Sequence, residues 1–121
     1  MSATILVVDD QPMFERLIRN LFRDQIDEGI YEFVFALDGA EALEALEQNA
    51  AIDMVLSDIN MPRMDGLTFL NKVHELRPML KVVMVSAYGD MANIRQAMNF
   101  GAYDFVPKPI IRQLLEPLLK D

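Results

Sequence analysis

The sequence contains no cysteine, and it has no long apolar run. The missing thiols exclude disulfide bonds, thiolate metal sites and a cysteine nucleophile. No apolar stretch approaches the length that a membrane-spanning helix needs. The first ten residues, MSATILVVDD, carry no basic segment and no cleavage-site pattern, so we expect no signal peptide. These absences are compatible with a cytoplasmic protein and with no membrane partner.

Basic residues are also scarce, because 11 Lys and Arg stand against 19 Asp and Glu, a net charge of −8. This balance argues against direct nucleic-acid binding through a basic face. It favours a site for a cation or a partner with basic contacts, although solubility alone would explain an acidic surface. With 52% hydrophobic residues in 121, the chain can bury one core, and we expect a single domain over 1–121.

Five short segments are predicted to be strands. Most are near-continuous apolar runs rich in β-branched residues, which is typical of strands covered on both faces of a parallel sheet. They are 4–9, 31–37, 53–58, 81–86 and 103–107.

The segments between and after these strands have helical periodicity. Asp38 stands three residues before Glu41, a capping-box-like start, and Gly101 is a suitable left-handed stop. Pro117 predicts a kink or an early end in the last helix. The strand–helix order, repeated five times, predicts a doubly wound α/β fold with a parallel sheet and five flanking helices. The predicted helices are 11–26, 38–49, 66–78, 90–101 and 110–121.

Chemically active residues stand where the predicted strands end. The first strand ends at Asp9 and Asp10, the third at Asp58, the fourth at Ser86, and Lys108 follows the fifth. In such folds the functional cleft lies at the carboxyl ends of the strands. Clustered carboxylates repel one another unless a cation joins them, and Mg²⁺ is the hard cation that oxygen ligands favour. Asp58 could then act as a nucleophile, because carboxylates form acyl-phosphates, with Lys108 and Ser86 around the phosphoryl oxygens.

Each residue taken alone has an ordinary structural explanation. A single Asp at a strand end is commonly a cap or turn residue, and Asp10 could cap the helix that follows. Asp65 is assigned to capping the helix that begins near Gly66. The sole histidine, His74, is predicted to be solvated and without a chemical role. The combination at one sheet edge favours function, because clustered like charges cost stability.

The residues resemble those of response regulator receiver domains, the phosphoacceptor domains of two-component signalling, over essentially the whole length. The most specific stretch is DMVLSDINMPRMDG, whose Asp-x-Asn-Met-Pro-x-Met-Asp-Gly run follows an upstream double Asp and precedes a Lys-Pro pair. The matching stretches are ILVVDDQP (5–12), DGAEAL (38–43), DMVLSDINMPRMDG (53–66), VVMVSAYGD (82–90) and GAYDFVPKP (101–109).

The resemblance implies a flavodoxin-like sheet in the order 2-1-3-4-5. It implies that Asp58 accepts a phosphoryl group from a phosphohistidine on a sensor histidine kinase or a histidine phosphotransfer protein. Asp10 and Asp58 would ligate Mg²⁺ through their side chains and Asn60 through its backbone carbonyl, while Asp9 would assist. Lys108 would contact the phosphoryl oxygens, and its peptide bond to Pro109 would be cis.

Further roles also follow from the resemblance alone. Ser86 and Tyr103 would form the switch that changes the surface of the last two helices and the fifth strand. Asn60 and Tyr88 would tune how long the phosphoryl group lasts. The output would be a domain in cis or an effector protein in trans, and a phosphorylation-dependent homodimer is among the assemblies that the resemblance allows.

Two other classes of protein remain as alternatives. A phosphorylation-independent binding module on the same fold need not keep Asp9, Asp10, Asp58, Ser86 and Lys108 together. A haloacid-dehalogenase-type phosphatase needs an Asp-x-Asp nucleophile after the first strand and a cap region, whereas this strand ends in Asp-Asp-Gln with no room for a cap. Both alternatives fit the sequence less well than a phosphoacceptor domain does. Such a domain is not an enzyme, because it accepts a phosphoryl group without repeated turnover of a substrate.

Overall fold

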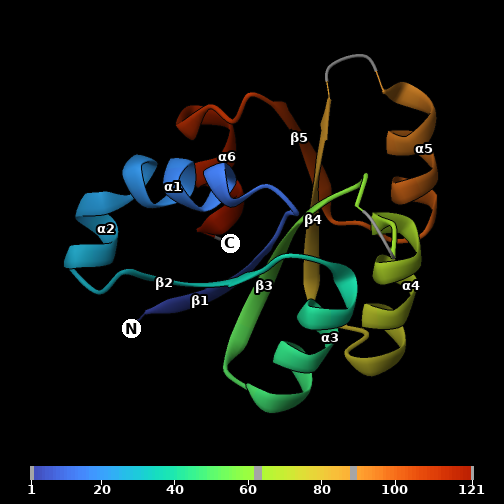
Figure 1. Ribbon diagram of the computed structural model, residues 1–121, viewed down its shortest axis with the longest axis horizontal. Coiled ribbons are helices and arrows are strands. Elements are labelled where there is room, and N and C mark those ends of the chain that lie inside the picture. The colour runs from blue at the N-terminus through green and yellow to red at the C-terminus, as the bar shows by residue number, and fades with distance from the viewer. Residues whose placement is uncertain (1, 62–63, 88–89, 121) are drawn as a thin grey trace.

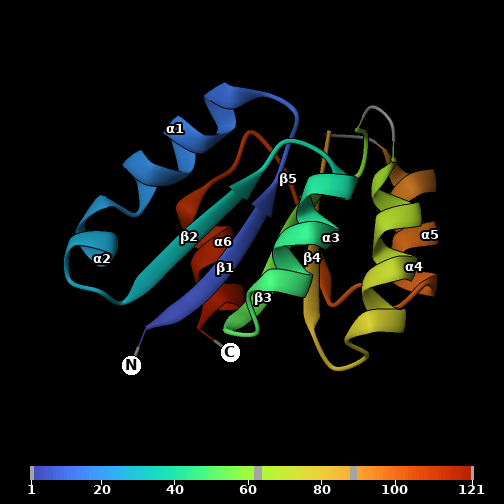
Figure 2. The same ribbon diagram turned by 60° about the horizontal axis from the view of Figure 1, so that its bottom comes forward.

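The fold is built on one five-stranded parallel sheet in the order β2-β1-β3-β4-β5, as predicted. The computed structural model describes residues 2–61, 64–87 and 90–120. Figure 2 shows β1 and β2 side by side and running in the same direction. The strands are β1 Ala3–Val8, β2 Tyr31–Ala36, β3 Ile52–Asp58, β4 Lys81–Ala87 and β5 Asp104–Lys108.

Helices cover both faces of this sheet. In Figures 1 and 2, α1, α2 and α6 lie on one side and α3, α4 and α5 on the other. None of the described helices is long and apolar enough to cross a membrane. The helices are α1 Pro12–Leu21, α2 Arg23–Asp27, α3 Gly39–Gln48, α4 Gly66–Leu76, α5 Met91–Asn99 and α6 Arg112–Leu119.

The two faces of the sheet form two separate cores, which explains the continuous apolar runs. Ile5 and Val7 of β1 point into the layer with α1 and α6, whereas Leu6 and Val8 point into the layer with α3, α4 and α5. Successive side chains in a strand alternate between faces, so a strand buried on both sides has no polar face.

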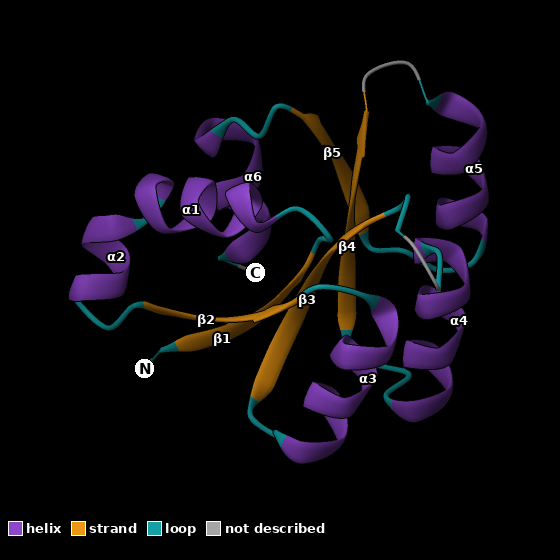
Figure 3. Cartoon of the chain, viewed as in Figure 1, coloured by secondary structure: helices purple, strands orange, loops and turns teal. Residues whose placement is uncertain are grey.

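The predicted helix at 11–26 is wrong in one respect, because it divides into α1 and α2 at Phe22. Phe22 has φ −118° and ψ 27°, outside the helical range. Its ring is fully buried and meets the edge of Tyr31 at a centroid distance of 5.7 Å. Burial of this ring against β2 overrides the helical periodicity. Figure 3 shows the non-helical link, which raises the described helices to six.

Several helix ends are confirmed. The Asp38 carboxylate accepts from the Glu41 amide at 2.8 Å, and Asp65 accepts from the Thr68 amide at 2.8 Å. Gly101 has φ +98° after α5, a left-handed conformation that glycine adopts readily. Of the kink or early end expected at Pro117, the early end is wrong, because α6 continues to Leu119, and the kink stays a prediction. Leu115 and Leu119 are both buried, and their packing holds the helix on either side of the proline.

His74 is only partly solvated, so the prediction of a solvated side chain is wrong for one end of its ring. Its Nε2 atom is buried and has no hydrogen-bond partner among the described residues. A Cβ built on Gly101 would stand 3.0 Å from that atom, so the His74 ring packs against Gly101, which has no side chain. The prediction failed because helical position alone does not reveal which neighbouring turn will cover a side chain.

Arg77 joins the end of α4 to the segment between α3 and β3. Its guanidinium donates to the carbonyl oxygens of Leu46 (2.9 Å), Asn49 (2.9 Å) and Ile52 (3.1 Å). Carbonyls at a helix end have no partner within the helix, so one planar side chain with several donors satisfies groups that would otherwise need water.

We predict that Arg77→Ala lowers the free energy of unfolding by about 2 kcal/mol, because hydrogen bonds from a charged donor are lost. Urea denaturation followed by circular dichroism measures the change. Arg95→Ala, an exposed position on α5, is the matched control and should change stability by less than about 0.5 kcal/mol. Equal effects of the two substitutions would contradict the role given to Arg77.

Candidate functional site

The strand register brings the predicted site residues to one edge of the sheet. Val8 pairs with Ser57, Asp58 with Val85, and Ala87 with Lys108. β4 and β5 run on past the level of Asp58 to Ala87 and Lys108, so the carboxyl ends of β1, β3, β4 and β5 lie at one edge of the sheet without being level. Asp9 follows β1 directly. Asp9, Asp58 and Ser86 are buried, while Asp10 is exposed. The residues that the sequence placed at strand ends are thus brought together.

Lys108 is the cation at the centre of this edge. Its Nζ atom lies 3.0 Å from Asp9 Oδ2 and 3.1 Å from Asp58 Oδ2. The same ammonium lies 5.4 Å from the centroid of the Phe14 ring. The Lys108–Pro109 peptide bond is cis, as predicted. One ammonium therefore bridges two buried carboxylates that come from neighbouring strands.

The second oxygen of each buried carboxylate holds the loop that follows it. Asp9 Oδ1 accepts from the Gln11 amide at 2.8 Å, and Asp58 Oδ1 accepts from the Asn60 amide at 3.1 Å. Each carboxylate is thereby fixed in orientation, with Oδ2 facing the shared centre. A group held in this way needs little reorganisation before it binds a cation or reacts.

The carboxylates fit a divalent cation. Asp9, Asp10 and Asp58 each offer an oxygen, and these atoms lie within 4.8 Å of one another. Hard cations such as Mg²⁺ take oxygen ligands and usually keep several waters, so an open site with a few carboxylates suits them. The donor set is therefore chemically appropriate for such an ion.

The electrostatics of Asp58 are set by opposing effects. Burial raises its pKa above the ordinary value of 3.8, while the Asn60 amide and Lys108 act in the opposite direction and Asp9 adds to the rise. For Lys108, burial favours the neutral form, but bonds to Asp9 and Asp58 outweigh it and raise the pKa. Lys108 is therefore charged at neutral pH, and Asp58 is a carboxylate whose ionised form is disfavoured by its surroundings.

The loop after Asp58 is held close by Gly66. The Gly66 amide donates to the Ile59 carbonyl at 2.6 Å, and a Cβ built on Gly66 would stand 2.5 Å from the Asp58 carbonyl oxygen. Any side chain would displace the backbone that carries Asp58. Glycine is thus required here by close approach rather than by an unusual φ.

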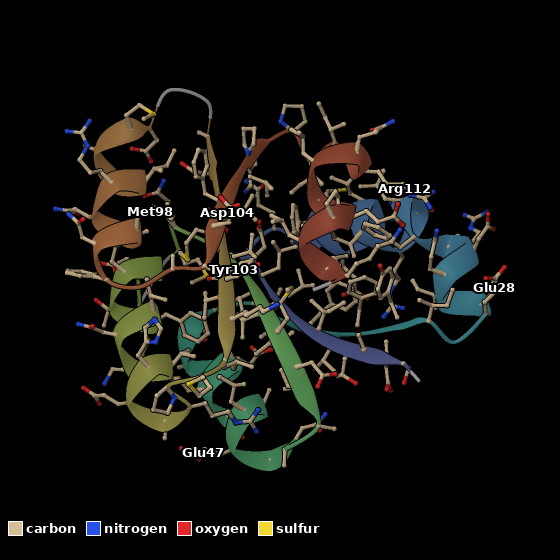
Figure 4. All side chains as sticks on the ribbon, turned by 180° about the vertical axis from the view of Figure 1, so that it is seen from behind. Glu28, Glu47, Met98, Tyr103, Asp104 and Arg112 are labelled. Atoms are coloured by element: carbon tan, nitrogen blue, oxygen red, sulfur yellow. The ribbon has the colours of Figure 1, made fainter. Side chains whose placement is uncertain are left out.

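The remaining predicted residues are distributed around the edge. The Asn60 amide group lies 3.5 Å from the Asp90 carboxylate. Tyr103 immediately precedes β5, and its amide donates to the Val82 carbonyl at 2.8 Å. Figure 4 shows Tyr103 between α5 and α6, where 42% of it is exposed and the Lys81 ammonium lies 4.7 Å from its ring centroid. Tyr88 lies outside the described residues.

Sequence reasoning missed one residue of this edge, Asp90. It was taken only as the start of a helix, yet its carboxylate contacts the side chains of Ser86, Asn60 and Asn93. Ser86 and Asn93 are close to Asp90 in the sequence, but no local pattern signals the contact with Asn60, which is 30 positions away.

The fold and this edge together define a doubly wound α/β protein with a carboxylate and lysine site at the carboxyl ends of its strands. The family model described as "Response regulator receiver domain" matches residues 5–120. The chain belongs to this family.

Relatives support the same conclusion. The response regulator protein FleR of Pseudomonas aeruginosa is 38% identical over 117 residues, covering 96% of this chain and 24% of FleR. The chemotaxis protein CheY of Bacillus subtilis is 32% identical over 109 residues, covering 90% of this chain and 88% of CheY. The solved receiver domain of NtrX from Brucella abortus is 35% identical with a TM-score of 0.85, covering 96% and 94% of the two chains. The chain therefore spans about a quarter of FleR but most of CheY.

We predict that Asp58→Asn raises the thermal unfolding midpoint at neutral pH without divalent cations. Burial raises the pKa of Asp58 in the folded state, so the unfolded state ionises more readily and ionisation opposes folding. Protonated Asp58 contributes its full stability at pH values below the pKa that Asp58 has in the unfolded chain. This contribution is lost as the pH rises through the higher pKa of Asp58 in the folded protein.

Differential scanning calorimetry of both proteins across acidic to neutral pH measures this difference. The advantage of the variant should grow as pH rises from the ordinary carboxyl range to neutrality. A variant that is less stable than the wild type at neutral pH would show that pairing with Lys108 outweighs burial, contrary to this prediction.

Proposed function

We propose that this protein is a phosphorylation-dependent signalling switch whose phosphoacceptor is Asp58. The observation that carries the proposal is the buried Asp58 carboxylate with one oxygen fixed by the Asn60 amide and the other facing Lys108 and two further acids. A carboxylate with a local capping role accepts from a nearby helix amide, as Asp38 and Asp65 do, whereas Asp58 also faces a partly buried ammonium.

In the proposed transfer, an Asp58 oxygen attacks the phosphorus of a phosphohistidine on a sensor histidine kinase or phosphotransfer protein. The new O–P bond forms as the P–N bond breaks, and the bonding electron pair returns to the imidazole nitrogen. The Lys108 ammonium and the Ser86 hydroxyl meet the phosphoryl oxygens, where charge is concentrated during transfer.

Asp9, Asp10 and Asp58 would hold Mg²⁺ through carboxylate oxygens, and Asn60 through its backbone carbonyl. When bound, this ion would neutralise the charge of the phosphoryl oxygens beside the carboxylates. The chain's own contribution is to hold the carboxylates in place, since Gln11 and Asn60 donate backbone amides to them. Lys108 favours the ionised form of Asp58, which is the form that can attack.

The proposed output is a shift between two states of the surface formed by α5, β5 and α6. A phosphoryl group on Asp58 adds negative charge and acceptor oxygens that draw the Ser86 hydroxyl, and Tyr103 turns inward as room opens. Phosphorylation need only favour one state differentially. Asn60 and Tyr88 are proposed to tune the lifetime of the phosphoryl group.

The proposed partners are a kinase or phosphotransfer protein and an output that reads the switched surface. The net charge of −8 argues against direct binding of nucleic acid, so we propose that any effect on DNA acts through an output domain in cis or an effector in trans. The match to about a quarter of FleR supports the first arrangement, and the match to most of CheY supports the second. A homodimer through the switched surface belongs to the same proposal, as does a cytoplasmic location.

We predict that incubation with Mg²⁺ and acetyl phosphate adds one acid-stable, base-labile phosphoryl group per chain, because Asp58 forms an acyl-phosphate. Mass spectrometry of the intact protein measures the added group. Asp58→Asn should remain unmodified, whereas the control Asp65→Asn should be modified like the wild type. Continuous release of phosphate would indicate a phosphatase, and no modification at all would indicate a phosphorylation-independent binding module.

We also predict that Mg²⁺ stabilises the folded protein by about 2.7 kcal/mol at a free concentration about a hundredfold above its dissociation constant. Thermal unfolding at matched ionic strength measures this effect. Asp10→Asn should weaken it, because a carboxylate ligand is lost. Glu47→Gln, an exposed acid on α3 labelled in Figure 4, is the control for charge alone. Equal weakening by both variants would refute a specific site.

A further inference from the structure

Asp90, the residue before α5, contacts three side chains through one carboxylate oxygen. Its Oδ2 atom lies 3.1 Å from Asn93 Nδ2, 3.5 Å from Asn60 Nδ2 and 3.5 Å from Ser86 Oγ. Ser86 is the residue before the last in β4 and Asn60 follows β3, so this one acid joins the start of α5 to the ends of two strands at the edge that carries Asp58. Its backbone also takes part, since the Asp90 amide donates to the Ala87 carbonyl at 3.2 Å.

Two other helices in the same chain show how an N-cap aspartate caps the helix that it precedes. Asp38 before α3 and Asp65 before α4 each accept from a helix backbone amide at 2.8 Å. Asp90 occupies the same N-cap position, but within the described residues its side chain accepts no capping hydrogen bond from the helix backbone. Its carboxylate is turned to side chains instead. Capping therefore does not account for its orientation.

The Ser86 hydroxyl can give up its contact with Asp90 in favour of another acceptor. The Ser86 hydroxyl has one proton, and two acceptors share it, the Ala87 carbonyl at 3.3 Å and Asp90 Oδ2 at 3.5 Å. Both distances exceed the usual O–H···O range of about 2.5–3.0 Å, so both contacts are weak and neither acceptor holds the proton strongly. An incoming anion with short oxygen contacts would compete successfully for it.

We propose that Asp90 is a positioning residue that holds the Ser86 hydroxyl and the Asn60 amide in the unphosphorylated arrangement and releases Ser86 when Asp58 carries a phosphoryl group. This inference rests on the proposed function and deepens it. Because Asp90 begins α5, loss of its contact with Ser86 frees the start of that helix. The exchange of one hydroxyl between two anionic acceptors thereby links the chemistry at Asp58 to the position of α5.

The test is the binding of beryllofluoride, an analogue of the phosphoryl group, in the presence of Mg²⁺. We compare the wild type with Asp90→Ser, because serine caps helices about as well as aspartate but is too short to reach Ser86 and Asn60. Without the competing acceptor, Asp90→Ser should bind beryllofluoride about threefold to tenfold more tightly. Titration followed by two-dimensional amide NMR gives the dissociation constants.

A double-mutant cycle with Ser86→Ala separates this role from a general effect of charge. In the Ser86→Ala background, Asp90→Ser should change the affinity by less than about twofold, because the exchanged hydroxyl is absent. Removal of a nearby negative charge alone would tighten binding equally in both backgrounds, and that result would overturn the inference. Asp65→Asn is the matched control at another N-cap and should leave the affinity unchanged.

A second readout needs no phosphoryl analogue. In the unmodified protein, the side-chain amide resonances of Asn93 and Asn60 should shift in Asp90→Ser, whereas a pure capping role would leave them in place. Wild-type affinity in Asp90→Ser, with unshifted resonances, would overturn the inference while leaving the proposed function intact. Failure of the wild type to bind beryllofluoride would overturn the proposed function and this inference with it.

Discussion

The structure depends on the pairing of two buried carboxylates with one ammonium at the carboxyl edge of the sheet. Asp9 and Asp58 lie on adjacent strands, and their charges would repel each other in a buried setting without a cation. Lys108 reaches them from β5, on the far side of β4. The strand order is therefore tied to the site, because it sets the position from which Lys108 reaches Asp9 and Asp58.

The same constraint explains how each carboxylate divides its two oxygens. One oxygen accepts a backbone amide from the following loop, which fixes the direction of the side chain, and the other meets Lys108. The first oxygen of each carboxylate therefore accepts a local backbone amide, as a helix cap does. The second oxygen belongs to the binding site. Gly66 adds to this arrangement by allowing the backbone at the start of α4 to approach Asp58 and Ile59 closely. Local backbone geometry and the chemistry of the edge are thus built from the same residues.

Most elements could be predicted because their signals are local. An apolar β-branched run such as 53–58 becomes β3, and a polar Asp three residues before Glu41 caps α3. The failures have a common cause. Phe22 interrupts a periodic helix because its ring packs on β2, His74 is covered by the Gly101 turn, and Leu119 holds α6 beyond Pro117. Each depends on a neighbour that is distant in the sequence.

The sequence by itself determined the alternation of strands and helices, the two-sided burial of the sheet and the set of acids, serine and lysine at the strand ends. Periodicity and residue type are sufficient for these features, since parallel strands always end at a common edge. Only the tertiary structure decided which of these groups touch. It placed Lys108 between Asp9 and Asp58, and it turned Asp90 from its helix toward Ser86 and Asn60. The contacts of Lys108 with Asp9 and Asp58, and of Asp90 with Asn60, join segments that are far apart in the chain. Their geometry is set by the packing of whole elements rather than by any local pattern.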